Sequence, residues 1–88
     1  MAWTASFDPR ALKELEGLDR VAQRRVVKFL QERVLLRTDP RDLGKAMIGD
    51  KAGLWRYRVG HHRLICHIDD KAESIRVLRV AHRKEAYG

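Results

Sequence analysis

Arginines occupy alternate positions in the second half of the chain, where the surrounding residues predict short strands. Arg56 and Arg58 alternate with Trp55, Tyr57 and Val59. Because successive side chains of a strand point to opposite faces, one face of this strand is cationic and the other is aromatic and apolar. The guanidinium is a strong hydrogen-bond donor that stays protonated and holds phosphate through two parallel bonds. The spacing therefore predicts an anion-binding strand.

The next two predicted strands carry the same pattern. Arg63 and Arg79 fall on the faces opposite the apolar positions of their strands, and Arg83 follows just beyond the last strand with the parity of Arg79. The apolar positions are Leu64, Cys66 and Ile68, then Leu78 and Val80. If the strands pair, several guanidiniums converge on one face of a small sheet. Their repulsion is unfavourable unless an anion binds, and a phosphate backbone is the ligand that this predicts.

The first half of the chain predicts the elements that support this sheet. Residues 2–7 read as a first strand, Asp8-Pro9 as the start of a helix, and Asp19 as the cap of a second, longer helix. In that helix Val26, Val27, Leu30 and Val34 recur at helical spacing. Residues 41–53 read as a loop that holds a turn of helix, while residues 59–61 and 69–73 read as tight strand connections.

These elements predict a single domain over residues 1–88 with the order β-α-α-β-β-β. The fold class is α+β, a small antiparallel-rich sheet with an N-terminal helical hairpin packed on one face. The chain has no apolar run near the roughly 20 residues that a membrane helix needs, and its start lacks the layout of a secretory signal. Cys66, the one cysteine, reads as a reduced core thiol compatible with the cytoplasm.

Charge separates the two halves of the sequence. The net charge is +7 with a pI of about 10.2. Residues 51–88 carry nine basic and four acidic side chains, a net of +5, whereas residues 1–50 carry ten and eight, a net of +2. The excess lies on the sheet half, which suggests a nucleic acid, a phosphorylated ligand or an acidic protein partner. Composition alone leaves these three open.

Several blocks of sequence, in this order and spacing, resemble the RelE/ParE superfamily of bacterial toxin–antitoxin toxins. They are F-D-P-R-A-L-K-E-L near the start, D-P in mid-chain, L-W-R-Y-R-V-G-H-H-R-L-I-C-H-I, and V-L-R-V-A-H-R-K-E-A-Y at the end. RelE-type members cut messenger RNA in the ribosomal A site, whereas ParE-type members poison DNA gyrase. The ending His82-Arg83-Lys84-Glu85-Ala86-Tyr87 is similar to that of the RelE branch and favours the ribonuclease.

The resemblance implies which residues act. The family's basic cleft residues map onto Arg56, Arg58, Arg63 and Arg83, and its C-terminal tyrosine onto Tyr87. The best-studied pattern has lysines where Arg56 and Arg58 stand, and arginine is the poorer proton donor or acceptor. RNA-binding candidates are His61, His82, Arg79 and Lys84. Arg79 also fits an ordinary solvated strand position, and His61 an ordinary exposed turn. Arg24, Arg25 and Lys28 are typical of an exposed helix face, with ribosomal RNA contact as the alternative.

The implied reaction is metal-independent cleavage by the RNA's own 2′-hydroxyl, without a cofactor. The arginines suit stabilisation of charge on phosphorus. Tyr87 needs neighbouring guanidiniums to lower a pKa near 10 before it can act as a base, and His82 titrates near neutrality. The identity of the base stays open. No Cys-x-x-Cys or spaced histidine pair predicts a metal site.

The resemblance also implies partners. They are a cognate antitoxin, the ribosome with messenger RNA in its A site, and operator DNA through the antitoxin complex only, with no membrane. Two alternatives stay open, a gyrase poison on the same fold and a nonenzymatic RNA-binding module. The gyrase poison would not need Tyr87, and the RNA-binding module would bind without cleaving.

Overall fold

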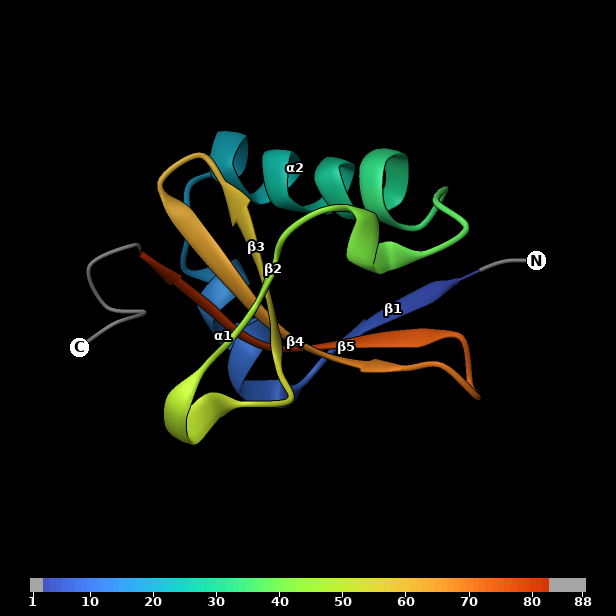
Figure 1. The fold of residues 1–88 in the computed structure, drawn as a ribbon. Helices are drawn as coiled ribbons and strands as arrows, with labels where there is room; N and C mark the ends of the chain where they lie inside the picture. Colours follow the sequence, from blue (N-terminus) through green and yellow to red (C-terminus); the bar gives the residue numbers. More distant parts are fainter. Residues whose placement is uncertain (1–2, 83–88) are drawn as a thin grey trace.

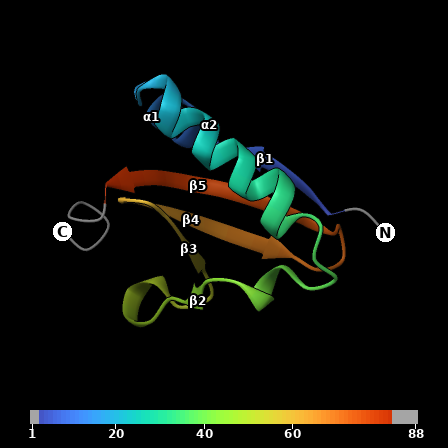
Figure 2. The same cartoon turned by 90° about the horizontal axis from the view of Figure 1, so that it is seen from above.

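Residues 3–82 fold into a five-stranded mixed sheet with two helices packed against one face (Figures 1 and 2). The computed structural model describes residues 3–82. The strands run in the order β1-β5-β4-β3-β2 across the sheet. Their bounds are β1 Thr4–Phe7, β2 Lys45–Ala46, β3 Trp55–Val59, β4 His62–Asp69 and β5 Ser74–His82, and the helices are α1 Pro9–Glu16 and α2 Arg20–Phe29. The predicted α+β class with a helical hairpin on one face is confirmed.

The first strand leads directly into the first helix. β1 pairs in parallel with β5, from Thr4 opposite Ser74 to Phe7 opposite Val77. Asp8 is extended and Pro9 takes the first helical position, as the sequence predicts. The Asp8 side chain makes no capping bond, however. One of its oxygens instead accepts from Arg76 Nη2 at 2.7 Å, which ties the start of α1 to the strand beside β1.

The second helix begins at the predicted cap. Asp19 Oδ1 accepts from the backbone N–H of Ala22 at 2.8 Å. Val26, Leu30 and Val34 are buried at four-residue spacing, which shows that the helical path runs past α2. It does so as a π-helical turn over Leu30–Val34, closed by a bond from Leu35 N to Leu30 O of 2.9 Å. The helices of residues 3–82 are all too short or too polar to cross a lipid bilayer.

The three long strands form an antiparallel meander. Residues 60–61 turn β3 into β4, and residues 70–73 turn β4 into β5, as predicted. The expectation that Leu78 shares a face with Val80 is wrong. A bulge places Ile65 opposite Arg79 but Cys66 opposite Val77, so Leu78 is the extra residue on β5. Val77 and Val80 therefore share the core face.

The segment between the helices and β3 is more ordered than the sequence indicates. It holds short 3₁₀ turns at Pro40–Asp42 and Gly49–Lys51, as expected of a loop with helical turns. It also holds β2, a fifth strand that the sequence does not predict, which pairs antiparallel with β3. Because β2 is only two residues long, the sequence shows no alternation of apolar and polar residues there. Tertiary contacts fix it instead.

Three aromatic side chains hold this segment against the sheet. Trp3 Nε1 donates to Thr38 O at 3.2 Å, Tyr57 Oη to Pro40 O at 2.7 Å, and Trp55 Nε1 to Leu43 O at 2.7 Å. Gly44 follows with φ near +80°, and a Cβ there would lie 2.4 Å from Arg56 O. Only glycine allows the chain to pass this close to β3. The aromatic residues of β3 thus serve as hydrogen-bond donors as well as core.

The core lies between the helices and the sheet. Its fully buried members come from both layers and include Ala11, Val26, Val34, Tyr57, Leu64, Cys66, Ile75 and Val77. Phe29 of α2 packs edge-on against Tyr57, with ring centroids 5.8 Å apart. Cys66 is a free, buried thiol, as predicted. Burial raises the pKa of Cys66 to about 12, so this thiol is neutral and unreactive at physiological pH.

Candidate functional site

Three of the predicted arginines lie together on the sheet face opposite the buried side chains of β3. Arg58 of β3 is directly opposite Arg63 of β4, and Arg56 lies two residues before Arg58 on the same strand. Side chains at directly opposed antiparallel positions are about 4.5–5.5 Å apart at Cβ, so these groups are neighbours. We call Arg56, Arg58 and Arg63 the arginine row. The structure brings these predicted residues together.

Members of the row differ in exposure. Arg58 is exposed, Arg56 is half-buried, and Arg63 is only 4% exposed. None of the ion pairs within residues 3–82 involves Arg58. Like charges directly opposite each other destabilise a sheet, and a bound anion would offset this repulsion. A site with this composition is suited to binding an anion.

Lys45 adds a cation that the sequence pattern does not predict. It lies on β2 directly opposite Arg56. Lys45, Arg56 and Arg58 line one depression of about 290 Å³ together with Phe29, Leu43 and Gly44. Residues 41–53 show no strand period, so only the hydrogen bonds that anchor this segment reveal that Lys45 joins the site.

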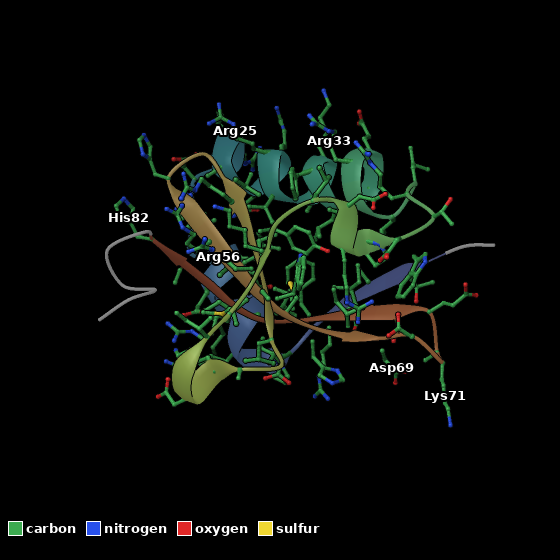
Figure 3. The ribbon with its side chains drawn as sticks, in the orientation of Figure 1. Arg25, Arg33, Arg56, Asp69, Lys71 and His82 are labelled. Atoms are coloured by element: carbon green, nitrogen blue, oxygen red, sulfur yellow. The ribbon has the colours of Figure 1, made fainter. Side chains whose placement is uncertain are left out.

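Histidines gather where β3 turns into β4 and β5 ends. The rings of His61 and His82 stack with centroids 6.2 Å apart and 19° between their planes, and His62 meets His82 edge-on at 5.8 Å. His62 is also the residue opposite His82 on the neighbouring strand. His62 directly precedes Arg63, so the cluster adjoins the arginine row. Figure 3 shows His82 at the end of the molecule away from Asp69 and Lys71. The two predicted histidines are therefore placed side by side.

Arg79 occupies a different position from the row. Its Nη2 lies 2.9 Å from Glu14 Oε2, and its Nε donates to both carboxylate oxygens at 3.0–3.1 Å. Glu14 also accepts from the backbone N–H of Val80 at 2.9 Å. The structure thus gives Arg79 a role in joining α1 to β5. The RNA contact of Arg79 stays a prediction.

Three predicted residues, Arg83, Lys84 and Tyr87, lie outside the described residues. Their roles stay predictions. Within residues 3–82, no three histidine, cysteine or acidic side chains converge in a way that would hold a metal ion. Tyr57 is the tyrosine nearest the row in sequence, but burial raises its pKa well above the ordinary value and its hydroxyl donates to Pro40 O. Tyr57 is therefore a structural donor.

Comparison with known proteins decides the family. A model of the "ParE toxin of type II toxin-antitoxin system" matches residues 5–87. The chain belongs to the RelE/ParE superfamily of type II toxin–antitoxin toxins. The toxin RelG of Mycobacterium tuberculosis is 32% identical over 87 residues, which cover 99% of this chain and 98% of RelG. The resemblance drawn from the sequence is confirmed.

Solved structures of this superfamily share the fold. The RelBE2 toxin–antitoxin complex from Mycobacterium tuberculosis contains a chain that matches with a TM-score of 0.84 and 30% identity, covering 94% of this chain and all of that one. The RelE–RelB complex from Pyrococcus horikoshii matches with a TM-score of 0.67 and 25% identity over 94% of this chain and 97% of that one.

Proposed function

We propose that this toxin is a metal-independent endoribonuclease that cleaves messenger RNA on the ribosome. The observation that carries the proposal is the arginine row, in which Arg58 and Arg63 are opposed across two strands. Such a concentration of guanidiniums fits a phosphate that gains negative charge during reaction. The C-terminal resemblance to the RelE branch and the likeness to RelG support the same assignment.

In the proposed reaction the RNA 2′-hydroxyl attacks the adjacent phosphorus, and the bond to the 5′-oxygen of the next nucleotide breaks. The products are a 2′,3′-cyclic phosphate and a 5′-hydroxyl. Arg56, Arg58, Arg63 and Arg83 stabilise the charge on the pentacoordinate phosphorus. Each charge-assisted hydrogen bond is worth about 1.5–3 kcal/mol, so two or three gained in the transition state accelerate the reaction greatly.

Proton transfer is assigned to Tyr87 and His82. Tyr87 fits the position of the family's C-terminal tyrosine, and guanidiniums close to it would lower its pKa towards neutrality. His82 lies at the end of β5 within the histidine cluster, and histidine is a common general acid and base. His61 and Lys84 serve RNA binding in this proposal.

A cognate antitoxin is the second part of the proposal. Two of the structural relatives are themselves toxin–antitoxin complexes. The outer side of α2 offers a depression of about 500 Å³ in which Leu15 and Val27 lie beside Arg24 and Lys28. Leu12, on α1, is 44% exposed. An amphipathic segment with acidic residues fits this surface, and operator DNA would be reached through the antitoxin.

A gyrase poison is the second candidate, because the matching family model is described as a ParE toxin. A poison acts by binding and requires no proton transfer. The two candidates therefore differ in whether messenger RNA is cut and in whether Tyr87 matters.

Purified ribosomes carrying a defined messenger RNA test the proposal. The toxin is expected to cut the RNA in the A site and leave the 2′,3′-cyclic phosphate that attack by the RNA's own 2′-hydroxyl produces, and Tyr87→Phe to slow the cut. The same RNA without ribosomes is expected to stay intact. If the RNA on ribosomes stays uncut and the toxin blocks supercoiling by purified gyrase, the nuclease proposal is wrong and the protein is a gyrase poison.

A further inference from the structure

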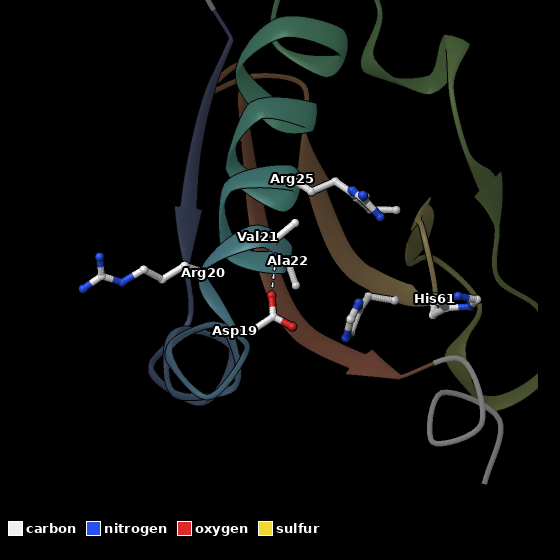
Figure 4. A pocket seen from close by; sticks show the side chains of 8 residues that line it. Asp19, Arg20, Val21, Ala22, Arg25 and His61 are labelled. Carbon is white, nitrogen blue, oxygen red and sulfur yellow. Dashed lines mark hydrogen bonds between the residues drawn. The ribbon is translucent and has the colours of Figure 1, made fainter.

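A hollow of about 400 Å³ lies beside the arginine row, between the start of α2 and the β3–β4 turn (Figure 4). We call it the corner pocket. Its lining includes Asp19, Val21, Ala22, Arg25, Val59 and His61. From the sequence, Arg25 is typical of an exposed helix face. Figure 4 shows Arg25 extending from α2 towards the strand region that carries His61.

Arg25 is fitted to the turn beneath it. A Cβ on Gly60 would lie 3.2 Å from Arg25 Nη1 and 3.8 Å from Arg25 Cδ. Gly60 also has φ near +60°, so glycine serves both the turn and the close approach of the guanidinium. Arg25 is thereby placed over the turn that joins the two strands of the arginine row.

The walls of the corner pocket are suited to a flat, uncharged heterocycle. Val21, Ala22 and Val59 supply apolar surface, and Val21 is 64% exposed. An imidazole and a guanidinium are the planar groups on which unpaired RNA bases stack. His62 and Arg20 complete the lining, and Figure 4 shows the Arg20 side chain extending away from the hollow. The carboxylate of Asp19 can accept from the amino groups of a base. Asp19 Oδ1 is engaged by Ala22 N, and Oδ2 takes no part in that bond.

Arg25 connects the corner pocket with the arginine row. It also lines an adjoining depression of about 540 Å³, whose other members include Arg58, Val59 and Gly60. An RNA strand whose phosphate is bound at Arg58 therefore has a base-sized hollow next to it, with one guanidinium shared between the two.

We propose that the corner pocket binds one unpaired base of the RNA strand whose phosphates lie along the arginine row. This inference rests on the proposed function, since it names a specificity subsite for that substrate. Arg25 and His61 are its stacking groups, and Asp19 favours a base that carries an amino group.

A thermodynamic cycle tests the subsite without requiring cleavage. The probes are a 2′-O-methyl RNA trinucleotide, which cannot be cut by its own hydroxyl, and versions with one base removed at each position. We expect removal of one particular base to weaken binding to the wild-type toxin about tenfold, in the range of base stacking. In Arg25→Ala and in His61→Ala, this base-dependent difference is expected to vanish. Arg37→Ala, which removes an exposed arginine that lines neither depression, keeps it.

The outcomes separate the subsite from the nuclease. Equal binding of all base-lacking probes by the wild-type toxin, or a full tenfold difference retained in both Arg25→Ala and His61→Ala, would overturn the subsite. Cleavage on purified ribosomes is measured separately, so a toxin that fails to cut RNA yet shows the base-dependent cycle refutes the nuclease and upholds the subsite.

Discussion

At the scale of single residues, Arg58 and Arg63 lie directly opposite each other on neighbouring strands but differ in their exposure to solvent. Arg58 is exposed, whereas Arg63 is 4% exposed. A change at Arg63 therefore alters both the charge of the site and the packing around a buried side chain. A change at Arg58 removes charge with little effect on packing. Arg58 is the cleaner probe of the chemistry.

Arg58→Ala is expected to lower the rate of RNA cleavage on ribosomes by about 10- to 100-fold, which is the loss of one charge-assisted bond in the transition state. Its melting temperature is expected to stay near that of the wild type. The matched control is Arg76→Ala, which removes an arginine of β5 whose partner is Asp8. If Arg76→Ala slows cleavage as much as Arg58→Ala, total charge and not the arginine row explains the rate.

Cys66 gives the opposite expectation, a structural effect without a catalytic one. Its thiol is fully buried, and burial raises its pKa to about 12. Cys66→Ser places a hydroxyl in an apolar site, which is expected to cost about 1–3 kcal/mol of unfolding free energy. Denaturant unfolding measures the cost, and cleavage at a temperature where both proteins are folded is expected to be equal. Loss of cleavage with unchanged stability would give Cys66 a role in the reaction.

At the scale of elements, the carboxylate of Glu14 joins the middle of α1 to β5. β1 covers the edge of β5 only as far as Val77, and beyond it Glu14 accepts from Arg79 and from the backbone of Val80. Burial, the largest influence, raises the pKa of Glu14. The bonds from Arg79 and Val80 together outweigh it, so the pKa of Glu14 is lowered.

The sign of the resulting pH dependence follows from that lowered pKa. The ionised Glu14 stabilises the fold at pH values above its pKa in the unfolded chain, and this stabilisation is lost as the pH falls through its pKa in the folded protein. Glu14→Gln is expected to cost about 1–2 kcal/mol of unfolding free energy at pH 7. The difference between the two proteins is expected to shrink as unfolding is measured at increasingly acidic pH. A difference that is constant from pH 7 to pH 2 would show that charge at Glu14 does not matter.

At the scale of the whole molecule, the sheet half carries most of the excess charge. Residues 51–88 contribute +5 of the net +7. The acidic residues Asp8, Glu14 and Asp70 pair with Arg76, Arg79 and Arg41. Those pairs join elements to one another, whereas Arg58 of the arginine row is exposed and is in none of these pairs. The molecule therefore presents one cationic face to a polyanion.

Local patterns predict much of this molecule. Helical spacing, the helix starts at Pro9 and Asp19, and strand alternation around Arg56 and Arg58 predict the elements and the row. These local patterns do not predict the features that are determined by contacts between residues far apart in the sequence. The hydrogen bond from Trp55 to Leu43, which are 12 residues apart in the sequence, helps to place β2 and Lys45. Glu14 and Arg79, which form a hydrogen bond, are 65 residues apart. The register between β4 and β5 shifts at the bulge, so the alternation of side chains along β5 changes at Leu78.

The most direct test of the central claim is to map messenger RNA 5′ ends in cells shortly after the toxin is induced, with Arg58→Ala and Tyr87→Phe alongside. The nuclease predicts new 5′ ends in phase with codons, confined to translated messages and reduced in both variants. Intact messages together with an induced DNA-damage response would contradict it and assign the toxin to the gyrase-poison branch.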